Sequence, residues 1–160
     1  MKGNLKIIFF SLLTGIFLQS CDDQAMFEKH VDFEKSQWSY ADSLVFNFEV
    51  DDTTGKYNLL LMVRSSDDKY PYQNLYILTR TTFPSGEVLT SPLNVILQGE
   101  KGDWLGNCSG DICELVVPLQ QNVRFTEIGE YRLSFQQYMR VNPLPGLYSL
   151  GFRIESAEKD

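Results

Sequence analysis

The stretch SLVFNFEV, residues 43–50, alternates apolar and polar side chains with a period of two. One face carries four apolar residues, Leu44, Phe46, Phe48 and Val50. Such alternation is typical of a β-strand that packs one face into a core. The next segment, DDTTGK (51–56), has the composition of a turn, so residues 43–50 are predicted to be a short strand that reverses direction at its end.

Further β-rich segments follow this strand, with Gly, Pro, Asp and Asn between them. They are YNLLLMVRS (57–65), NLYILTRTTF (74–83), EVLTSPLNVIL (87–97), CELVVPL (113–119), EYRLSFQQYM (130–139) and LYSLGFRI (147–154). Pro92 cannot donate a ladder hydrogen bond, which indicates an edge strand or a bulge. EIGEYRLSF (127–135) has a Gly turn before an early Tyr, as at sandwich corners. No long helical period competes, so we predict an all-β, antiparallel β-sandwich in one domain.

The N-terminus has the features of a secretory signal peptide. Lys2 and Lys6 precede IIFFSLLTGIFL (7–18), an uncharged run too short to span a membrane. The following LQSC (18–21) resembles a bacterial lipobox, in which the cysteine becomes the first mature residue. We predict a lipoprotein signal peptide over 1–20, a tether over 21–29 and the β-sandwich over 30–160.

In lipoproteins the cysteine at this position, here Cys21, carries acyl chains such as palmitate. Several chains on one residue hold a protein stably on a bilayer surface. The alternative is ordinary cleavage with Cys21 left as a free thiol. We expect a lipid-anchored protein of the cell envelope, on the outer rather than the inner membrane, with the leaflet left open.

The charge of the mature chain limits its partners. Removing Lys2 and Lys6 from the 14 basic residues leaves 12 against 21 acidic ones, a net charge of −9. This balance argues against binding nucleic acid, whose phosphates require basic patches. It also argues against electrostatic adhesion to anionic lipid.

Cys108 and Cys113 lie close together in NCSGDIC. In an exported chain such a pair favours a disulfide across a tight turn. Zinc would need four ligands, and the single histidine, His30, is distant in sequence. The spacing also differs from that of a CxxC redox site, so we expect a disulfide and no metal or other cofactor.

Catalytic patterns are absent from the sequence. No G-x-S-x-G elbow accompanies His30, and no phosphate-binding loop is present. Asp103, Asp111 and Glu114 could in principle form a carboxylate pair for glycoside hydrolysis, but acidic residues in turns are usually solvated. We therefore expect a protein that is not an enzyme.

Loop aromatics are better candidates for binding. Trp104 lies in a Gly-rich connection, and Tyr70, Tyr72 and Tyr76 cluster around Pro71. Such rings can stack on sugars or anchor a protein partner. Trp104 can equally fold back as a plug over the open end of the sandwich, and this is the interpretation we favour.

The succession NLY…PSG…GDWLGN…GDI…FTEIGEYRLSFQQYMR…LPGLYSLGFRIE, from about residue 74 to 155, resembles the gliding-motility lipoprotein H (GldH) family. WLG (104–106), MR (139–140) with LPG (144–146), and GFRIE (151–155) are the most specific parts. The chain departs from the family pattern at its cysteine pair. The resemblance implies a cell-envelope lipoprotein needed for gliding and for the associated secretion machinery, without a known catalytic residue.

We predict a non-catalytic component of such an envelope assembly that contacts other proteins of the machinery. Trp104, Arg140 and the Pro145–Gly146 turn are the candidate contact residues. Arg140 can present its guanidinium to a partner's carboxylate, or it can form a buried ion pair within the fold. The alternative function is an envelope carbohydrate-binding sandwich that uses its loop aromatics.

Overall fold

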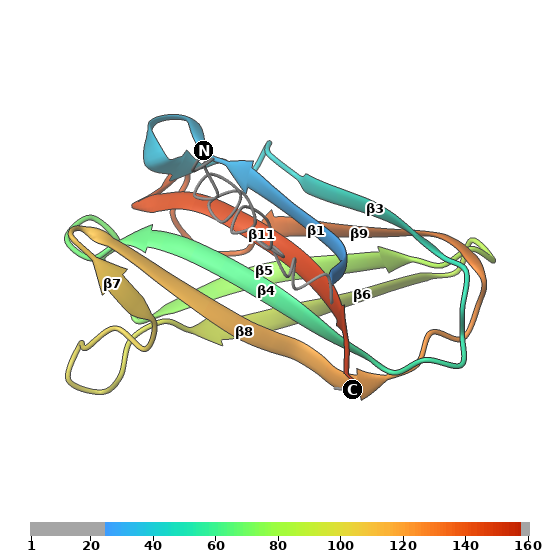
Figure 1. Ribbon diagram of the computed structural model, residues 1–160. Coiled ribbons are helices and arrows are strands. Elements are labelled where there is room, and N and C mark those ends of the chain that lie inside the picture. Colours follow the sequence, from blue (N-terminus) through green and yellow to red (C-terminus); the bar gives the residue numbers. More distant parts are fainter. Residues whose placement is uncertain (1–24, 158–160) are drawn as a thin grey trace, which may run out of the picture.

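The computed structural model describes residues 25–157, so the predicted signal peptide and Cys21 lie outside the described residues. Within that range the chain is all-β apart from one 3₁₀ turn, η1 (Glu34–Ser36). The strands, in chain order (Figure 1), are β1 (Ala25–Asp32), β2 (Gln37–Trp38), β3 (Leu44–Val50), β4 (Tyr57–Ser66), β5 (Asn74–Thr82), β6 (Val88–Ile96), β7 (Asn107–Ser109), β8 (Ile112–Val123), β9 (Gly129–Gln137), β10 (Leu144–Pro145) and β11 (Leu147–Ser156).

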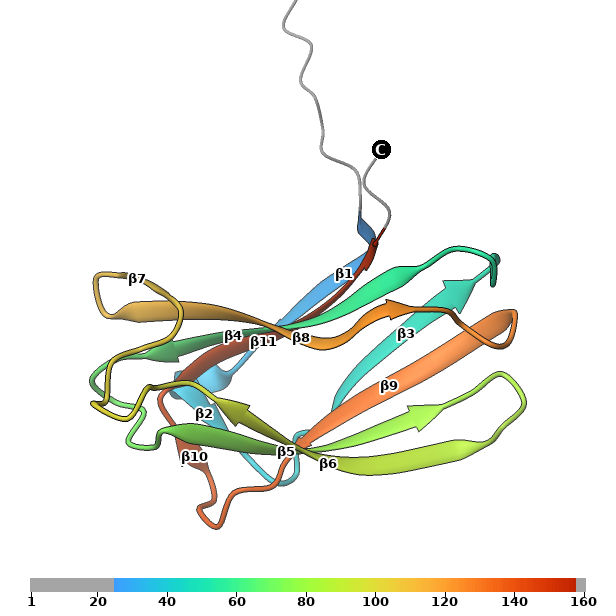
Figure 2. The same cartoon turned by 90° about the horizontal axis from the view of Figure 1, so that it is seen from below.

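These strands form two packed antiparallel sheets (Figure 2). The five-stranded sheet has the order β1-β11-β4-β8-β7, and the four-stranded sheet has the order β3-β9-β5-β6. A two-stranded ribbon pairs β10 with β2. The predicted antiparallel β-sandwich is confirmed, and Pro92 lies on β6, at the edge of its sheet.

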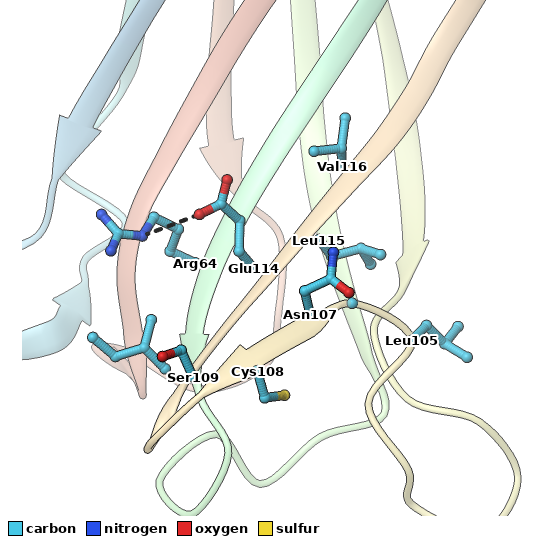
Figure 3. A pocket seen from close by; sticks show the side chains of 10 residues that line it. Arg64, Leu105, Asn107, Cys108, Ser109, Glu114, Leu115 and Val116 are labelled. Atoms are coloured by element: carbon cyan, nitrogen blue, oxygen red, sulfur yellow. Dashed lines mark ion pairs between the residues drawn. The ribbon is translucent and has the colours of Figure 1, made fainter.

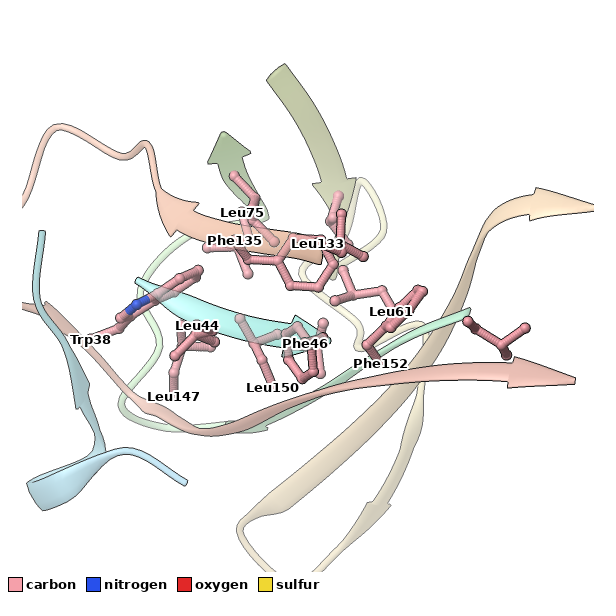
Figure 4. Packing of buried hydrophobic residues seen from close by; sticks show 14 of the residues in the cluster. Trp38, Leu44, Phe46, Leu61, Leu75, Leu133, Phe135, Leu147, Leu150 and Phe152 are labelled. Atoms are coloured by element: carbon pink, nitrogen blue, oxygen red, sulfur yellow. The ribbon is translucent and has the colours of Figure 1, made fainter. Parts of the chain in front are cut away.

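The alternation in residues 43–50 gives β3 one buried face. Its four apolar side chains are at most 7% exposed: Leu44, Phe46, Phe48 and Val50. The Phe46 ring lies 5.8 Å from that of Phe152 on the opposite sheet and 5.4 Å from that of Phe135 on β9. These side chains meet between the sheets (Figure 4). Burying one side chain of this size stabilises the fold by about 1.5 to 3 kcal/mol.

Strand β4 is apolar on both faces because it lies in the middle of the five-stranded sheet. Leu61 and Val63 face the core and are buried. Met62 faces outward, yet it is only 6% exposed. A Cβ added at Gly151 on neighbouring β11 would lie 2.5 Å from His30 Nδ1 and 2.9 Å from Met62 Cε. The missing side chain at Gly151 therefore leaves room for the His30 ring and the Met62 side chain to lie against the sheet.

The predicted tether is wrong over its second half. Strand β1 begins at Ala25 and pairs with β11, so the domain begins by residue 25 and not at residue 30. Lys29 occupies a position that faces the other sheet. Its Nζ donates to Val45 O at 3.2 Å and lies 5.9 Å from the centroid of the Phe46 ring. A lysine at an inward position hides the apolar alternation of this strand from sequence analysis.

The corner predicted from EIGEYRLSF is present. The Tyr131 hydroxyl donates to Glu127 O at 3.2 Å and accepts from Glu127 N at 3.2 Å. These bonds fix the turn that leads into β9, as in the tyrosine corners of other sandwiches.

Both ends of the described chain lie at the same end of the sandwich, because Ala25 pairs with Glu155. We call this the near end. The far end carries the ribbon β2–β10, the loop over residues 97–106, the β7–β8 hairpin and the connection between β9 and β10 (Figure 2). All candidate contact residues from the sequence lie at the far end.

Candidate functional site

Trp104 packs against the rim of the core. It forms an isolated bridge with Gln98, and its ring lies 6.2 Å from the Tyr70 ring. The side chain is partly buried against the core cluster. This placement agrees with the plug interpretation. The neighbouring Leu105, which is 52% exposed, is the more accessible apolar side chain of this loop.

The tyrosines around Pro71 fall into different environments. Tyr70 is buried, and its hydroxyl donates to Asn74 O at 2.8 Å. Burial raises the pKa of Tyr70 above its usual value. Tyr72 meets Tyr70 edge-on with ring centroids 5.8 Å apart. Tyr76 is 42% exposed and points outward from β5.

A cavity of 470 Å³ at the far end is lined by two of these tyrosines, Tyr72 and Tyr76. We call it the tyrosine–arginine pocket, and its lining residues are Tyr72, Asn74, Tyr76, Tyr138, Met139, Arg140 and Val141. Tyr138 is 60% exposed and was missed as a site residue from sequence. Its signal was available, because the alternation of EYRLSFQQYM places it on the same outer face as Gln136.

Arg140 is exposed and makes no ion pair within residues 25–157. The alternative of a buried structural ion pair is therefore wrong. The backbone around it is nevertheless held in place. Gln137 is buried, and its Oε1 accepts from Met139 N at 3.0 Å while its Nε2 donates to Val141 O at 3.0 Å.

Tyr40, from the segment between β2 and β3, ties the same loop down from outside. Its backbone N donates to Asn142 Oδ1 at 2.8 Å, and its hydroxyl donates to Met139 O. Gln136 Nε2 donates in turn to Tyr40 O at 2.9 Å. The Asn142–Pro143 peptide bond is cis. Arg140 is thus presented to solvent from a loop whose backbone is fixed on both sides.

The Pro145–Gly146 turn has a structural explanation. Gly146 is buried with φ +80°, and its N donates to Ser36 O at 2.9 Å while its O accepts from Ser66 N at 2.8 Å. A Cβ at this position would lie 2.5 Å from Tyr70 N. Pro145, half-buried on β10, pairs with Gln37. Only glycine fits the close approach at residue 146.

The predicted disulfide between Cys108 and Cys113 is present in the β7–β8 hairpin. Cys108 lines a second cavity of 680 Å³ on the outer side of the five-stranded sheet (Figure 3). Arg64 and Glu114 face this cavity and form an ion pair with Nε and Oε2 3.6 Å apart. Leu105 and Val116 are its exposed apolar lining.

The residues considered for catalysis do not converge. His30 lies on β1, where its Nε2 is 3.1 Å from Glu28 Oε1. Asp111 Oδ2 accepts from the Tyr148 hydroxyl at 3.5 Å, whereas Glu114 pairs with Arg64. Asp103 lies in the Trp104 loop.

Neither a metal-binding cluster nor a membrane-spanning helix occurs among the described residues. Between residues 25 and 157, no group of three or more His, Cys, Asp or Glu side chains is arranged to hold a metal ion. In the same part of the chain, no helix is long and apolar enough to cross a membrane.

Sequence similarity to known proteins extends over nearly the whole described domain. The model of the family described as "GldH lipoprotein" matches residues 25–154. The gliding motility lipoprotein GldH homolog of Christiangramia forsetii is 36% identical over 160 residues, which cover 94% of this chain and 96% of the relative. The gliding motility lipoprotein GldH of Flavobacterium johnsoniae is 30% identical over 154 residues, which cover 92% and 94%.

Among solved structures, a carbohydrate-binding module specific for non-crystalline cellulose, CBM28, aligns with a TM-score of 0.42 and 9% sequence identity. That alignment covers 82% of this chain and 75% of the module. The two gliding-motility relatives and the family model, by contrast, match nearly the full described domain in sequence. The chain belongs to the GldH lipoprotein family.

Proposed function

We propose that this protein is a non-catalytic component of the gliding and secretion-associated machinery of the cell envelope, held on the outer membrane by acyl chains on Cys21. The names of its two relatives support the gliding role, and the family description supports the anchor. The protein acts by binding other proteins of the assembly.

The observation that carries this proposal is the exposed position of Arg140 in the tyrosine–arginine pocket. Its guanidinium forms no ion pair within residues 25–157, and three tyrosines line the same pocket. Its loop is fixed by Gln137 and Tyr40. A fixed loop lowers the entropy cost of binding. Arginine and tyrosine are also the residue types that dominate binding energy at protein interfaces.

The position of the pocket fits a partner that stands away from the membrane. Four peptide bonds join Cys21 to Ala25, a reach of about 14 Å at most. Strands of nine residues, such as β5 and β9, add about 30 Å between the near and far ends. The tyrosine–arginine pocket therefore faces away from an anchor at Cys21.

Co-purification from detergent-solubilised envelope tests this function. Full-length tagged protein and its Arg140→Ala variant are compared with Arg124→Ala, which removes another exposed arginine without an ion pair within residues 25–157, in the β8–β9 loop at the near end. We expect Arg140→Ala to lower partner recovery about tenfold or more with an unchanged melting temperature, as for an interface hot spot.

The control Arg124→Ala should behave like the wild type in recovery, in melting temperature and in the motility or secretion of the cells. Full recovery of the same partners by Arg140→Ala would contradict the proposal.

A further inference from the structure

The outward-facing arginines of the two sheets differ in their pairing. On the outer face of the five-stranded sheet, Arg64 pairs with Glu114 at 3.6 Å. On the same face, Arg153 pairs with Glu28 at 3.4 Å and with Glu155 at 3.1 Å. Each arginine on this face is therefore paired with at least one carboxylate.

The arginines on the outer face of the four-stranded sheet form no such ion pairs within the described residues. Arg80 on β5 and Arg132 on β9 are exposed and, like Arg140, form no ion pair within residues 25–157. The outward positions of its strands hold only two carboxylates, Glu49 and Glu130, which face each other at the near end. Although the chain has a net charge of −7, three guanidinium groups on or beside this sheet face form no ion pair within residues 25–157.

Arg80 and Arg132 lie close together on this face. Arg80 is opposite Ser134 and Arg132 is opposite Thr82, so the two arginines are diagonal neighbours, with backbones about 7 to 8 Å apart. They share a hollow of 580 Å³. Its lining residues are Ser43, Leu78, Arg80, Thr82, Arg132, Ser134 and Gln136. Two neighbouring like charges repel each other, and an anion between them relieves that repulsion.

This hollow continues toward the tyrosine–arginine pocket. Gln136 lines the first, and Tyr138, two residues further on, lines the second. At about 3.4 Å per residue, Gln137 at the end of β9 lies about 17 Å beyond Arg132, and Arg140 follows three residues later in the next loop. We infer that the outer face of the four-stranded sheet is one continuous docking surface for an acidic protein partner, whose carboxylates bind the Arg80–Arg132 hollow at one end and Arg140 at the other.

This inference rests on the proposed function and names the chemistry of the partner. A sugar chain is a poorer occupant, because no aromatic ring lines the Arg80–Arg132 hollow for stacking. An anionic membrane is also a poorer occupant. Glu49 and Glu130 at the near end of the face would repel it.

The test uses full-length protein in detergent and a double variant, Arg80→Glu with Arg132→Glu. The matched control is Lys101→Glu with Arg124→Glu, which changes the net charge equally at two exposed positions outside this face. Fluorescence anisotropy measures binding of a synthetic 20-residue peptide of alternating Glu and Ser, and of its Gln–Ser counterpart. Polygalacturonate and phosphatidylglycerol vesicles are the other two probes.

We expect the Glu–Ser peptide to bind the wild type and the control alike. Binding should weaken at least tenfold in the double variant and fall as salt is raised, because the contacts are exposed charges. The Gln–Ser peptide should not bind. Equal binding by the double variant, or binding of polygalacturonate or vesicles in place of the peptide, would overturn the inference.

The two proposals fail separately. If the envelope partner is lost with Arg140→Ala but retained by the Arg80→Glu, Arg132→Glu variant, the docking surface is limited to the tyrosine–arginine pocket and the extended surface is wrong. If Arg140→Ala retains the partner as well, the proposed function is wrong.

Discussion

The side chain of Gln137 holds the backbone on both sides of Arg140. Its amide binds Met139 N and Val141 O, each at 3.0 Å, and the residue is only 1% exposed. Because both its oxygen and its nitrogen are used, the loop geometry at Arg140 depends on a residue that no partner can reach.

Gln137→Ala should therefore separate loop geometry from guanidinium chemistry. The substitution leaves the N–H of Met139 and the C=O of Val141 without their partner, which costs about 1 to 3 kcal/mol in the free energy of unfolding. Partner recovery should fall although Arg140 is still present. Denaturant unfolding and co-purification measure the two effects, and full recovery by a destabilised Gln137→Ala protein would show that the loop needs no fixed geometry.

Gly146→Ala should destabilise the fold more than Gly86→Ala. Both glycines have positive φ, +80° and +87°, which costs an alanine about 1 to 2 kcal/mol. A Cβ at residue 86 meets nothing within 4 Å, whereas one at residue 146 would lie 2.5 Å from Tyr70 N. Overpacking adds about 1 to 3 kcal/mol. Equal losses in thermal unfolding of the two variants would contradict the close approach.

Replacing Cys108 and Cys113 together by serine should cost about 2 kcal/mol, because the disulfide closes a short loop with a sequence separation of 5. Chemical denaturation of the double variant measures this loss. Mass spectrometry of a non-reduced digest of protein from the envelope should find the two cysteines linked. Two free thiols in that digest would contradict the bond.

Tyr70 should make the fold sensitive to high pH. Burial raises its pKa in the folded state, so the folded chain binds its proton more tightly than the unfolded chain does. The stabilising contribution is complete below the usual tyrosine pKa of about 10 and is lost as the pH rises above it. Between pH 9 and pH 11 the free energy of unfolding should fall more steeply for the wild type than for Tyr70→Phe. Parallel curves would exclude Tyr70 as the cause.

Cys21 should carry the acyl chains. Cells grown with a clickable fatty acid should label the wild type and not Cys21→Ala, which should appear as soluble or unprocessed exported protein. An unlabelled wild type would contradict the anchor.

The strands were predictable wherever apolar and polar residues alternate without interruption, as in β3 and β9. A strand with one buried face needs an apolar residue at every second position, and this pattern can be read from the sequence. Strand β1 was not predictable, because Lys29 takes an inward position, where it donates a hydrogen bond to Val45 O at the edge of the other sheet. Inward lysines on edge strands discourage pairing with other chains. They remove the apolar signal at the same time.

The candidate site was only partly predictable. Arg140 was selected from sequence as a candidate contact residue, and it lines the pocket. Its lack of an ion pair among the described residues depends on which acidic residues the fold brings near, and the separation of ion pairs between two faces has no local signature in the sequence. Gly146 was selected because it lies in a turn. Only glycine fits at this position, however, because the backbone of Tyr70, which is distant in sequence, lies so close. Tyr138 joins Tyr72 only because two loops meet at the far end.

The antiparallel pairing of β1 with β11 has a mechanical meaning for an anchored protein. If the membrane is attached before Ala25 and a partner binds at the far end, as proposed, a pull runs along the strands and at right angles to their hydrogen bonds. The bonds over seven residue pairs, from Ala25–Glu155 to Asp32–Ser149, then carry the load together in shear and are not opened one after another. The strand next to the anchor is in this way the one through which traction on the assembly would reach the membrane.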